Sequence, residues 1–279
     1  MAARPAAART VPSQRVRRHA LDAASRHAAP TAISTAKVKV SATISVVSRF
    51  VDIAVVGGTG DEGFGIALRL ARAGHNVVIG SRSEERGVQA AERAREMLGG
   101  DIPVDGTTNE TAAAGSQLVF VTVPYAGQAD IYRSIKDHVP PGRVVCDTTT
   151  PLATAVGGRP WQVLRPWHGS AAEQAKAILA DGVRLVSGFH TVSAEPLQDL
   201  GHPVEGDVLL CGDDAEAKGE VGGLVEQIPD LRWVDAGVLA MARVIEPLTA
   251  LMVSVNRAYK LHDTGIKLVG RDAWGNARG

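Results

Sequence analysis

The sequence predicts an α/β fold: a Rossmann-type doubly wound parallel sheet with a smaller C-terminal α/β unit and a disordered N-terminal extension. From Asp52 onward, short β-branched runs alternate with helical segments of about ten to fifteen residues, a pattern typical of parallel strands joined by helices. A glycine-rich turn follows the first run directly. We therefore expect a nucleotide-binding Rossmann domain over residues 51–150 and a smaller C-terminal unit over residues 151–279.

The expected strands have a largely apolar composition, which fits strands buried on both faces of a parallel sheet. In chain order they cover residues 53–56, 76–79, 118–123, 143–147, 183–187, 208–211 and 232–235. Helical composition and spacing predict helices over residues 63–73, 84–97 and 128–136. A longer apolar helix is expected over residues 239–261, where apolar side chains recur at helical spacing and form a core or dimer-interface stripe.

Composition places the chain among soluble globular proteins. Apolar residues make up 45% of its 279 residues and charged residues 22%, which allows an adequate core. Aromatic residues are scarce at 4%, so we expect no nucleic-acid partner. No run of about 18 apolar residues occurs, so we expect no membrane span and a cytoplasmic protein. Cys146 and Cys211 lie far apart and share no motif with histidines, which argues against a disulfide or a zinc site.

Residues 1–50 differ in composition from the rest of the chain. They contain nine Lys and Arg residues against the single acid Asp22, and they lack the apolar stretch of a secretory signal. Three interpretations stay open: a disordered tail, untranslated sequence added by an over-long gene assignment, or an organelle transit peptide. Val51 stands directly before the first strand, and valine codons can serve as bacterial starts. None of the three interpretations gives the segment a fold.

The turn after the first strand carries a phosphate-binding pattern. Gly58, Gly60 and Gly63 satisfy G-x-G-x-x-G and open the following helix. The first glycine permits the tight turn, the second lets the backbone approach a pyrophosphate, and the third lets helix and strand pack closely. Backbone N–H groups and the helix N-terminus then hold the anion. The strand, the turn and the helix together predict a dinucleotide site.

The end of the second expected strand indicates which dinucleotide is bound. A strand that binds NAD usually ends in Asp or Glu, which accepts hydrogen bonds from the ribose hydroxyls. Here Ser81 and Arg82 occupy this position, and Arg86 follows one turn into the next helix. A hydroxyl and two guanidinium groups suit a 2′-phosphate. The sequence therefore predicts NADP(H) as the cofactor.

Residues 148–169 interrupt the regular pattern. Gly157, Gly158 and Pro160 break the periodicity, and Trp161 and Trp167 follow. We expect an irregular connection between the two halves of the chain. Long loops of this kind are often functional.

The segment from Gly57 to Arg86 resembles F420-dependent NADP oxidoreductases. Further blocks continue the resemblance: Thr122-Val123-Pro124-Tyr125, Gly169-Ser170-Ala171-Ala172-Glu173, residues 187–194, residues 211–218, Asp235-Ala236-Gly237 and Gly265-Ile266-Lys267. Together they span nearly all of residues 51–270, and the Ser-Ala-Ala-Glu, Phe-His-Thr and Cys-Gly-Asp-Asp blocks are the most specific. The segment 147–168 and the N-terminal extension depart from the family pattern.

The resemblance implies a reductase that moves hydride between NADP(H) and the 8-hydroxy-5-deazaflavin coenzyme F420, with residues 151–279 as the deazaflavin-binding unit. It also implies a role for each matching position. The pyrophosphate side is held at Thr59, Gly60, Asp61 and Glu62, the 2′-phosphate at Ser81, Arg82 and Arg86, the nicotinamide half at Val123 and Ala194, and the deazaflavin near His190 and Thr264. Both cofactors are then small-molecule substrates, and we expect a homodimer.

In such a reaction both reacting centres belong to cofactors, so the protein aligns them and excludes water. We therefore expect no catalytic side-chain acid or base and no metal ion. His190 fits either a structural histidine or a donor to the deazaflavin. Two other functions stay open: an NADPH-dependent reductase of a small carbonyl or imine, which the short C-terminal unit disfavours, and a non-catalytic NADPH-binding regulator.

Overall fold

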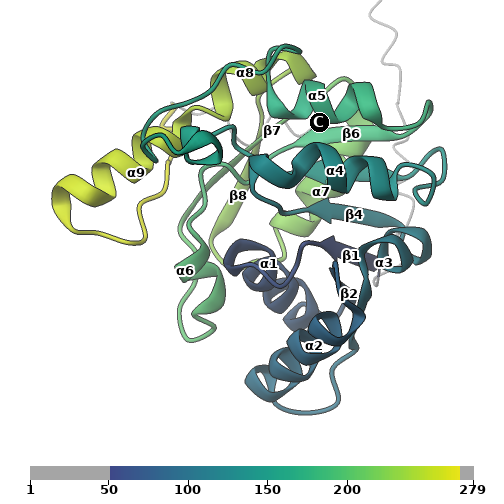
Figure 1. Cartoon of the computed structure of the whole chain (residues 1–279). Coiled ribbons are helices and arrows are strands. Elements are labelled where there is room, and N and C mark those ends of the chain that lie inside the picture. The colour runs from purple at the N-terminus through teal and green to yellow at the C-terminus, as the bar shows by residue number, and fades with distance from the viewer. Residues whose placement is uncertain (1–50, 271–279) are drawn as a thin grey trace, which may run out of the picture. The chain divides into compact units, whose positions relative to one another are not determined.

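A computed structural model describes residues 51–270, and the predictions for residues 1–50 lie outside the described residues. The described part confirms the α/β class, with one eight-stranded sheet and helices on both faces (Figure 1). The strands are β1 (Asp52–Val56), β2 (Asn76–Ser81), β3 (Val104–Thr108), β4 (Leu118–Val121), β5 (Val144–Asp147), β6 (Arg184–Ser187), β7 (Gly206–Gly212) and β8 (Leu231–Asp235). Their order across the sheet is β3-β2-β1-β4-β5-β6-β7-β8.

Two features of the sheet differ from the sequence prediction. β3 reads Val-Asp-Gly-Thr-Thr and lies at the edge of the sheet, where it pairs with β2. An edge strand buries less side-chain surface than a central one, so its sequence lacks the apolar run that marks the others. β7 pairs antiparallel with β6 and parallel with β8, so the sheet is mostly parallel. Antiparallel neighbours need no crossover helix. The prediction of a parallel sheet is therefore wrong for the β6–β7 pair.

The helices divide between the two faces of the sheet. They are α1 (Asp61–Arg72), α2 (Glu84–Leu98), α3 (Asn109–Gly115), α4 (Tyr125–Ile135), α5 (Ala171–Ile178), α6 (Ala194–Gln198), α7 (Ala215–Val225), α8 (Ala242–Ile245) and α9 (Leu248–Tyr259), with 3₁₀ turns η1 (Ala153–Val156) and η2 (Leu239–Met241). Alternate residues of β1 enter opposite cores. Ile53 and Val55 pack with α1, α2 and α7, whereas Ala54 and Val56 pack with α3, α4 and α5.

The apolar stretch predicted as one helix over residues 239–261 is helical but divided. It consists of η2, α8 and α9, with a turn at Glu246 and Pro247 where proline cannot continue the hydrogen-bond ladder. By length and composition alone, Leu239–Tyr259 could cross a membrane, a test that core helices of soluble proteins also pass. The expected absence of a membrane span therefore stays a prediction.

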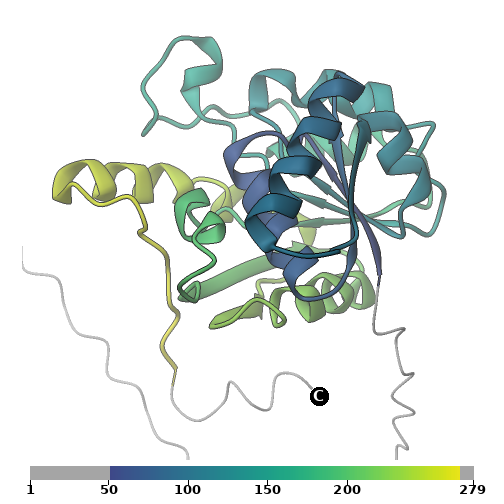
Figure 2. The same ribbon diagram turned by 90° about the horizontal axis from the view of Figure 1, so that it is seen from below.

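After α9 the chain passes the start of β7 (Figure 2). The Asp207 N–H donates to the Ile266 carbonyl at 2.8 Å, and the Leu268 N–H donates to Asp207 Oδ2 at 2.6 Å. Arg232 Nη2 lies 2.5 Å from the same carboxylate oxygen. These contacts fasten the returning segment to the sheet and so hold the far end of α9.

The first described residue is already tied into the fold. The Val51 N–H donates to His75 Nδ1 at 3.1 Å, and His75 Nε2 lies 3.0 Å from Gln227 Oε1. Because the sequence of residues 1–50 carries no periodic apolar face, we expect a variant lacking residues 2–48 to keep its melting temperature within about 2 °C and to bind NADPH normally. Differential scanning fluorimetry with and without NADPH measures both. Aggregation or lost binding would show that the extension packs on the fold.

Candidate active site

The candidate site lies at the carboxyl ends of the central strands, where β1 and β4 are neighbours and the direction of the strand order reverses. The helices that follow these strands, α1 and α4, cover opposite faces of the sheet. Their first turns therefore border one crevice. In open α/β sheets, ligands bind in the crevice at this switch point.

The turn after β1 has the close packing that its glycine pattern predicts. The Gly58 N–H donates to the carbonyls of Val55 and Gly80, both at 3.1 Å. A Cβ atom on Gly58 would lie 2.7 Å from the Val55 oxygen, and one on Gly63 would lie 2.2 Å from Thr122 Oγ1. A larger residue at Gly63 would push α1 away from the sheet, and one at Gly58 would distort the turn. The role of the turn in holding a pyrophosphate stays a prediction.

Asn109 holds this turn in place, and the sequence analysis did not single it out. It is the buried first residue of α3, directly after the unpredicted strand β3. Its side-chain Oδ1 accepts a hydrogen bond from the Gly57 N–H at 3.1 Å, across 52 positions of sequence. A contact of this span leaves no local pattern. Asn109 is therefore a site residue that only the fold reveals.

A nucleotide pocket of about 420 Å³ extends from the glycine turn to the end of β2. Thr59, Gly60, Ser81, Arg82 and Arg86 line it, so the structure brings these predicted residues together. Ser81 is buried and both arginines are exposed. Neither guanidinium forms an ion pair within residues 51–270. Two unpaired cations beside a hydroxyl have the chemistry that a 2′-phosphate requires.

Two further hollows adjoin the nucleotide pocket, and we call them together the cleft. The inner hollow measures about 270 Å³ and shares Gly60, Thr122 and Val123 with the nucleotide pocket. The outer hollow measures about 580 Å³, lies beside α9 and shares Glu62 and His190 with the inner one. Val123 therefore lies where the nucleotide pocket and the cleft meet.

The remaining predicted residues lie in different pockets. Asp61 and Ala194 line the outer hollow of the cleft. Thr264 lines a neighbouring pocket of about 540 Å³, where its carbonyl accepts a hydrogen bond from Ser193 Oγ at 3.1 Å. The Thr264 hydroxyl donates to Asn256 Oδ1, and Asn256 lines the cleft. Thr264 thus stands behind the cleft wall.

His190 stands at the centre of a hydrogen-bonded group inside the cleft. Its Nε2 lies 2.8 Å from Ser187 Oγ, and its Nδ1 lies 3.2 Å from Thr150 Oγ1. Thr150 also bonds Thr249 Oγ1 at 2.9 Å, and the Thr249 hydroxyl lies 2.8 Å from the His190 carbonyl. The preceding residue, Phe189, has a left-handed φ of 68°. Backbone strain of this kind concentrates at functional sites.

The surroundings of His190 favour a neutral ring that fixes other side chains. Burial lowers the pKa of His190 to about 4, against a smaller opposing effect of a backbone hydrogen bond at Thr148. The imidazole is therefore uncharged near neutral pH, and both ring nitrogens are engaged by protein hydroxyls. Thr150 and Thr249 line the cleft. Thr150 bonds the ring, and Thr249 bonds Thr150 and the His190 carbonyl. His190 thus lines the cleft itself and also fixes these two threonines.

Two acids interact next to the cleft, of which Glu62 lines it and Asp147 does not. Asp147 is fully buried at the end of β5 and accepts hydrogen bonds from Gln128 Nε2 at 2.9 Å and Thr149 Oγ1 at 2.8 Å. Burial raises its pKa to about 7. Burial also raises the pKa of Glu62 to about 8, with a further contribution from the charge of Asp147. The raised pKa favours a protonated Glu62 at neutral pH, and Glu62 lines both hollows of the cleft.

The raised pKa of Asp147 predicts a stability that depends on pH. Between its ordinary value of 3.8 and about 7 the folded state holds a proton that the unfolded state releases, so stability falls as pH rises through this window. Relative to wild type, we expect Asp147→Asn to reduce the loss of unfolding free energy between pH 5 and 8 by roughly 1 to 3 kcal/mol. Urea unfolding at four pH values measures this slope.

The exposed Asp137→Asn variant is the matched control and should keep the wild-type slope. A wild-type slope in Asp147→Asn as well would mean that the buried carboxyl is ionised in the folded protein. Glu62 would then carry the pH dependence that remains.

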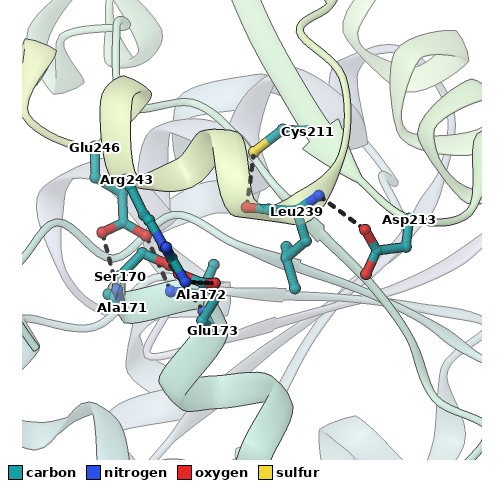
Figure 3. A network of polar contacts seen from close by, with 9 residues as sticks. All are labelled: Ser170, Ala171, Ala172, Glu173, Cys211, Asp213, Leu239, Arg243 and Glu246. Atoms are coloured by element: carbon teal, nitrogen blue, oxygen red, sulfur yellow. Dashed lines mark hydrogen bonds and ion pairs between the residues drawn. The ribbon is translucent and has the colours of Figure 1, made fainter. Parts of the chain in front are cut away.

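The Ser-Ala-Ala-Glu block builds a support for the cleft wall (Figure 3). Both carboxylate oxygens of Glu246 accept backbone N–H groups at the start of α5, from Ala171 and Ala172, each at 2.9 Å. Arg243 binds Glu173 through two contacts of 2.8 and 2.6 Å. The carboxylate and the arginine therefore join α5 to the turn where α9 begins.

The Cys-Gly-Asp-Asp block supports the same region from the other side. Asp213 Oδ1 accepts the Leu239 N–H at 3.0 Å, and the Cys211 thiol lies 3.8 Å from the Leu239 carbonyl (Figure 3). Asp214 caps α7 through the Ala217 N–H. Cys146 and Cys211 are both free and buried. These motif residues thus position the elements around the cleft and do not line it.

Arg69 fixes the opposite wall of the cleft to α1. Its side chain is buried, and its Nε donates to the Leu197 carbonyl at 2.9 Å. Its Nη2 lies 2.7, 2.5 and 2.9 Å from the carbonyls of Pro196, Asp199 and His202. One guanidinium therefore orders the whole loop that contains α6. Since α1 follows the glycine turn, this arginine ties the nucleotide side to the Ala194 side of the cleft.

The strand order, the glycine turn and the basic end of β2 together define a Rossmann-type dinucleotide-binding protein whose pocket suits NADP(H). The pattern of the family described as NADP oxidoreductase, coenzyme F420-dependent, matches residues 52–151. F420-dependent NADP reductases of Methanocaldococcus jannaschii and Methanothermobacter marburgensis are each 39% identical to the chain, over 77% of its length and 97% of theirs. The chain belongs to the family of F420-dependent NADP reductases, which confirms the resemblance seen in its motifs.

Solved structures agree on the fold. A crystal structure of an Arthrobacter protein covers 79% of this chain and 100% of its own length, with a TM-score of 0.68 and 24% identity. The 3-hydroxyisobutyrate dehydrogenase of Mycobacterium tuberculosis covers 75% of this chain and 62% of its own length, with a TM-score of 0.52 and 15% identity. At these identities the likeness shows the Rossmann-type architecture alone.

Proposed function

We propose that this protein transfers a hydride between NADP(H) and the deazaflavin coenzyme F420 across the junction at Val123. The observation that carries the proposal is that the nucleotide pocket and the cleft adjoin, because Gly60, Thr122 and Val123 line both. A dinucleotide that lies along the glycine turn then presents its nicotinamide to the cleft. A flat second cofactor in the cleft faces that ring. Family membership supports the same pair of cofactors.

The residues divide between the two cofactors. The pyrophosphate is bound by Gly58, Thr59, Gly60 and the backbone of Asp61 and Glu62, and the 2′-phosphate by Ser81, Arg82 and Arg86. The nicotinamide contacts Val123 and Ala194. The wall beside the deazaflavin is supported by His190 and Thr264. Within this division residues 51–150 form the NADP-binding domain and residues 151–279 the deazaflavin-binding unit. The side chain of Glu62 faces the deazaflavin half.

The reaction needs alignment more than acid–base chemistry. The hydride leaves C4 of NADPH for C5 of the deazaflavin, whose N1 takes a proton from solvent. The protein holds the two carbons near contact distance, and well-oriented reactants gain several orders of magnitude in rate this way. Thr150, Thr249 and protonated Glu62 offer hydrogen bonds at the cleft wall. No side chain is assigned as a catalytic acid or base.

One assay tests the proposal directly. Purified protein is mixed with NADPH and F420, and the loss of oxidised deazaflavin absorbance is followed. Stoichiometric loss of both NADPH and oxidised F420 supports the assignment. NADPH binding without oxidation would indicate the non-catalytic regulator, and NADPH oxidation by a small carbonyl or imine alone would indicate the carbonyl or imine reductase.

The assembly that we propose is a cytoplasmic homodimer with neither a nucleic-acid nor a membrane partner. Exposed apolar side chains gather along one stretch of the chain, at Val238, Met241, Val244 and Leu251. A second copy covering this stretch would bury apolar surface that water otherwise contacts. Light scattering coupled to gel filtration measures the mass, and a monomer over a range of concentrations contradicts the dimer.

A further inference from the structure

The irregular connection between β5 and α5 lies beside α9 (Figures 1 and 2). It folds back on itself as a short hairpin, in which Leu152 bridges Val163 and the Ala153 N–H donates to the Gln162 carbonyl at 2.8 Å. Leu152 lines the cleft. The hairpin therefore starts at the cleft and carries the next residues outward along α9.

Two arginines contact one indole ring on this hairpin. The Arg257 guanidinium of α9 lies 4.4 Å from the ring centroid of Trp161, and that of Arg159 lies 5.8 Å from it. Both distances are those of cation–π contacts. We call Arg159, Trp161 and Arg257 the rim cluster. It joins the hairpin to α9.

The rim cluster stands at the end of a cleft wall. Thr249 and Val253 of α9 line the cleft, and Arg257 follows Val253 by four residues, on the same helix face. Arg257 therefore stands one turn beyond Val253, just outside the residues that line the outer hollow. A ligand seated against Thr249 and long enough to leave the cleft along α9 reaches the rim cluster next.

The charge of the rim cluster is unbalanced. Neither Arg159 nor Arg257 forms an ion pair with any carboxylate in the part of the chain that the structure describes. Two cations beside one ring repel each other, and an anion between them would remove that repulsion. The other side of the outer hollow carries Asp61 and Glu195, which would repel the same anion. The charges therefore direct an anionic chain toward the rim cluster.

We propose that the rim cluster is a binding site for the anionic side chain of the deazaflavin substrate, the phosphodiester-linked chain that ends in glutamate carboxylates. The proposal rests on the proposed function, which supplies a substrate with such a chain. Guanidinium groups suit phosphate and carboxylate oxygens because they offer paired donors in a plane. The indole of Trp161 holds both arginines in position for the chain. The rim cluster thus selects the complete coenzyme over its ring system alone.

Two substrates that differ in the side chain alone test this assignment. One is F420, and the other is the 8-hydroxy-5-deazaflavin that keeps the ribityl group and lacks phosphate and glutamate. Steady-state rates with NADPH are measured for wild type, Arg159→Gln, Arg257→Gln and the double variant. Arg165→Gln is the matched control, because Arg165 is an exposed arginine of the same connection.

We expect the double variant to raise KM for F420 about 5- to 20-fold, the scale of charged hydrogen bonds at a partly exposed site. KM for the shortened deazaflavin and KM for NADPH should change less than about twofold. Added salt should raise KM for F420 more in wild type than in the double variant, since exposed charge pairs are screened. Arg165→Gln should match wild type in every measurement.

Two results would overturn the assignment while the proposed function stands. Equal rises of KM for both deazaflavins would mean that the rim cluster only latches the hairpin to α9. Unchanged KM values for both deazaflavins would mean that the rim cluster does not contact the substrate. If wild type reduces neither deazaflavin, the proposed function fails, and the assignment of the rim cluster fails with it.

Discussion

Replacing Arg82 by alanine is expected to lower kcat/KM for NADPH about 10- to 100-fold and to leave kcat/KM for NADH within about twofold of wild type. The two cofactors differ only in the 2′-phosphate. Arg82 lies at the end of β2 in the nucleotide pocket, and no protein carboxylate neutralises it within residues 51–270. Its charge is therefore available to the phosphate, and removing it should act on NADPH alone.

Three companion variants sharpen this test. Arg86→Ala should give a smaller loss in the same direction, because Arg86 lines the pocket from α2. Lys136→Ala removes an exposed cation at the far end of α4 and should change neither cofactor's kinetics. Steady-state kinetics with both nicotinamides gives the ratio directly. Equal losses with NADPH and NADH after Arg82→Ala would mean that Arg82 does not contact the 2′-phosphate.

The sequence predicts the central part of the fold because buried parallel strands consist of short runs of apolar residues. β1, β2, β4 and β5 all show such runs, and the glycine turn marks the end of β1. β3 escapes prediction because an edge strand with Asp105 and Gly106 resembles a loop. The reversed direction of β7 is set by tertiary pairing with β6 and has no local pattern.

The candidate site is predictable only where its residues follow one another in the chain. The glycine turn and the basic end of β2 are of this kind. The bond between Asn109 and Gly57 and the bond between Thr150 and Thr249 join residues 52 and 99 positions apart, so the fold alone creates them. The same holds for Arg69, which binds four carbonyls about 130 positions away.

The motifs that carry the family resemblance serve two different purposes. The glycine turn lies in the nucleotide pocket itself. The Ser-Ala-Ala-Glu and Cys-Gly-Asp-Asp blocks instead hold α5, η2 and α8 together through Glu246 and Asp213. Because α9 follows this support, the blocks set the position of Thr249 in the cleft. A specific motif can therefore act on the site from outside it.

Replacing His190 by alanine is expected to lower turnover about 10- to 100-fold, because small misplacements of reacting groups cost rates of this size. The ring holds Thr150, which in turn holds Thr249, and both threonines line the cleft. Without the ring, Thr150 and Ser187 lose their partner, so the wall that aligns the deazaflavin loosens. KM for F420 should rise as well, and KM for NADPH should stay within about twofold.

The pH profile separates this positioning role from acid–base catalysis. Burial lowers the pKa of His190 to about 4, so its charge does not change between pH 6 and 9, and the wild-type profile should show no step that His190→Ala removes. His75→Ala is the matched control. This variant also deletes a buried imidazole with two hydrogen-bond partners. These partners, Val51 and Gln227, lie outside the cleft.

His75→Ala should therefore lower the melting temperature as His190→Ala does and leave turnover nearly unchanged. A loss on the order of a million-fold in His190→Ala, with both cofactors still bound, would indicate an essential acid or base at this position. It would also favour the carbonyl reductase over the deazaflavin reductase. Unchanged turnover and unchanged F420 affinity would make His190 purely structural, and the deazaflavin would then contact the connection of residues 148–169 instead.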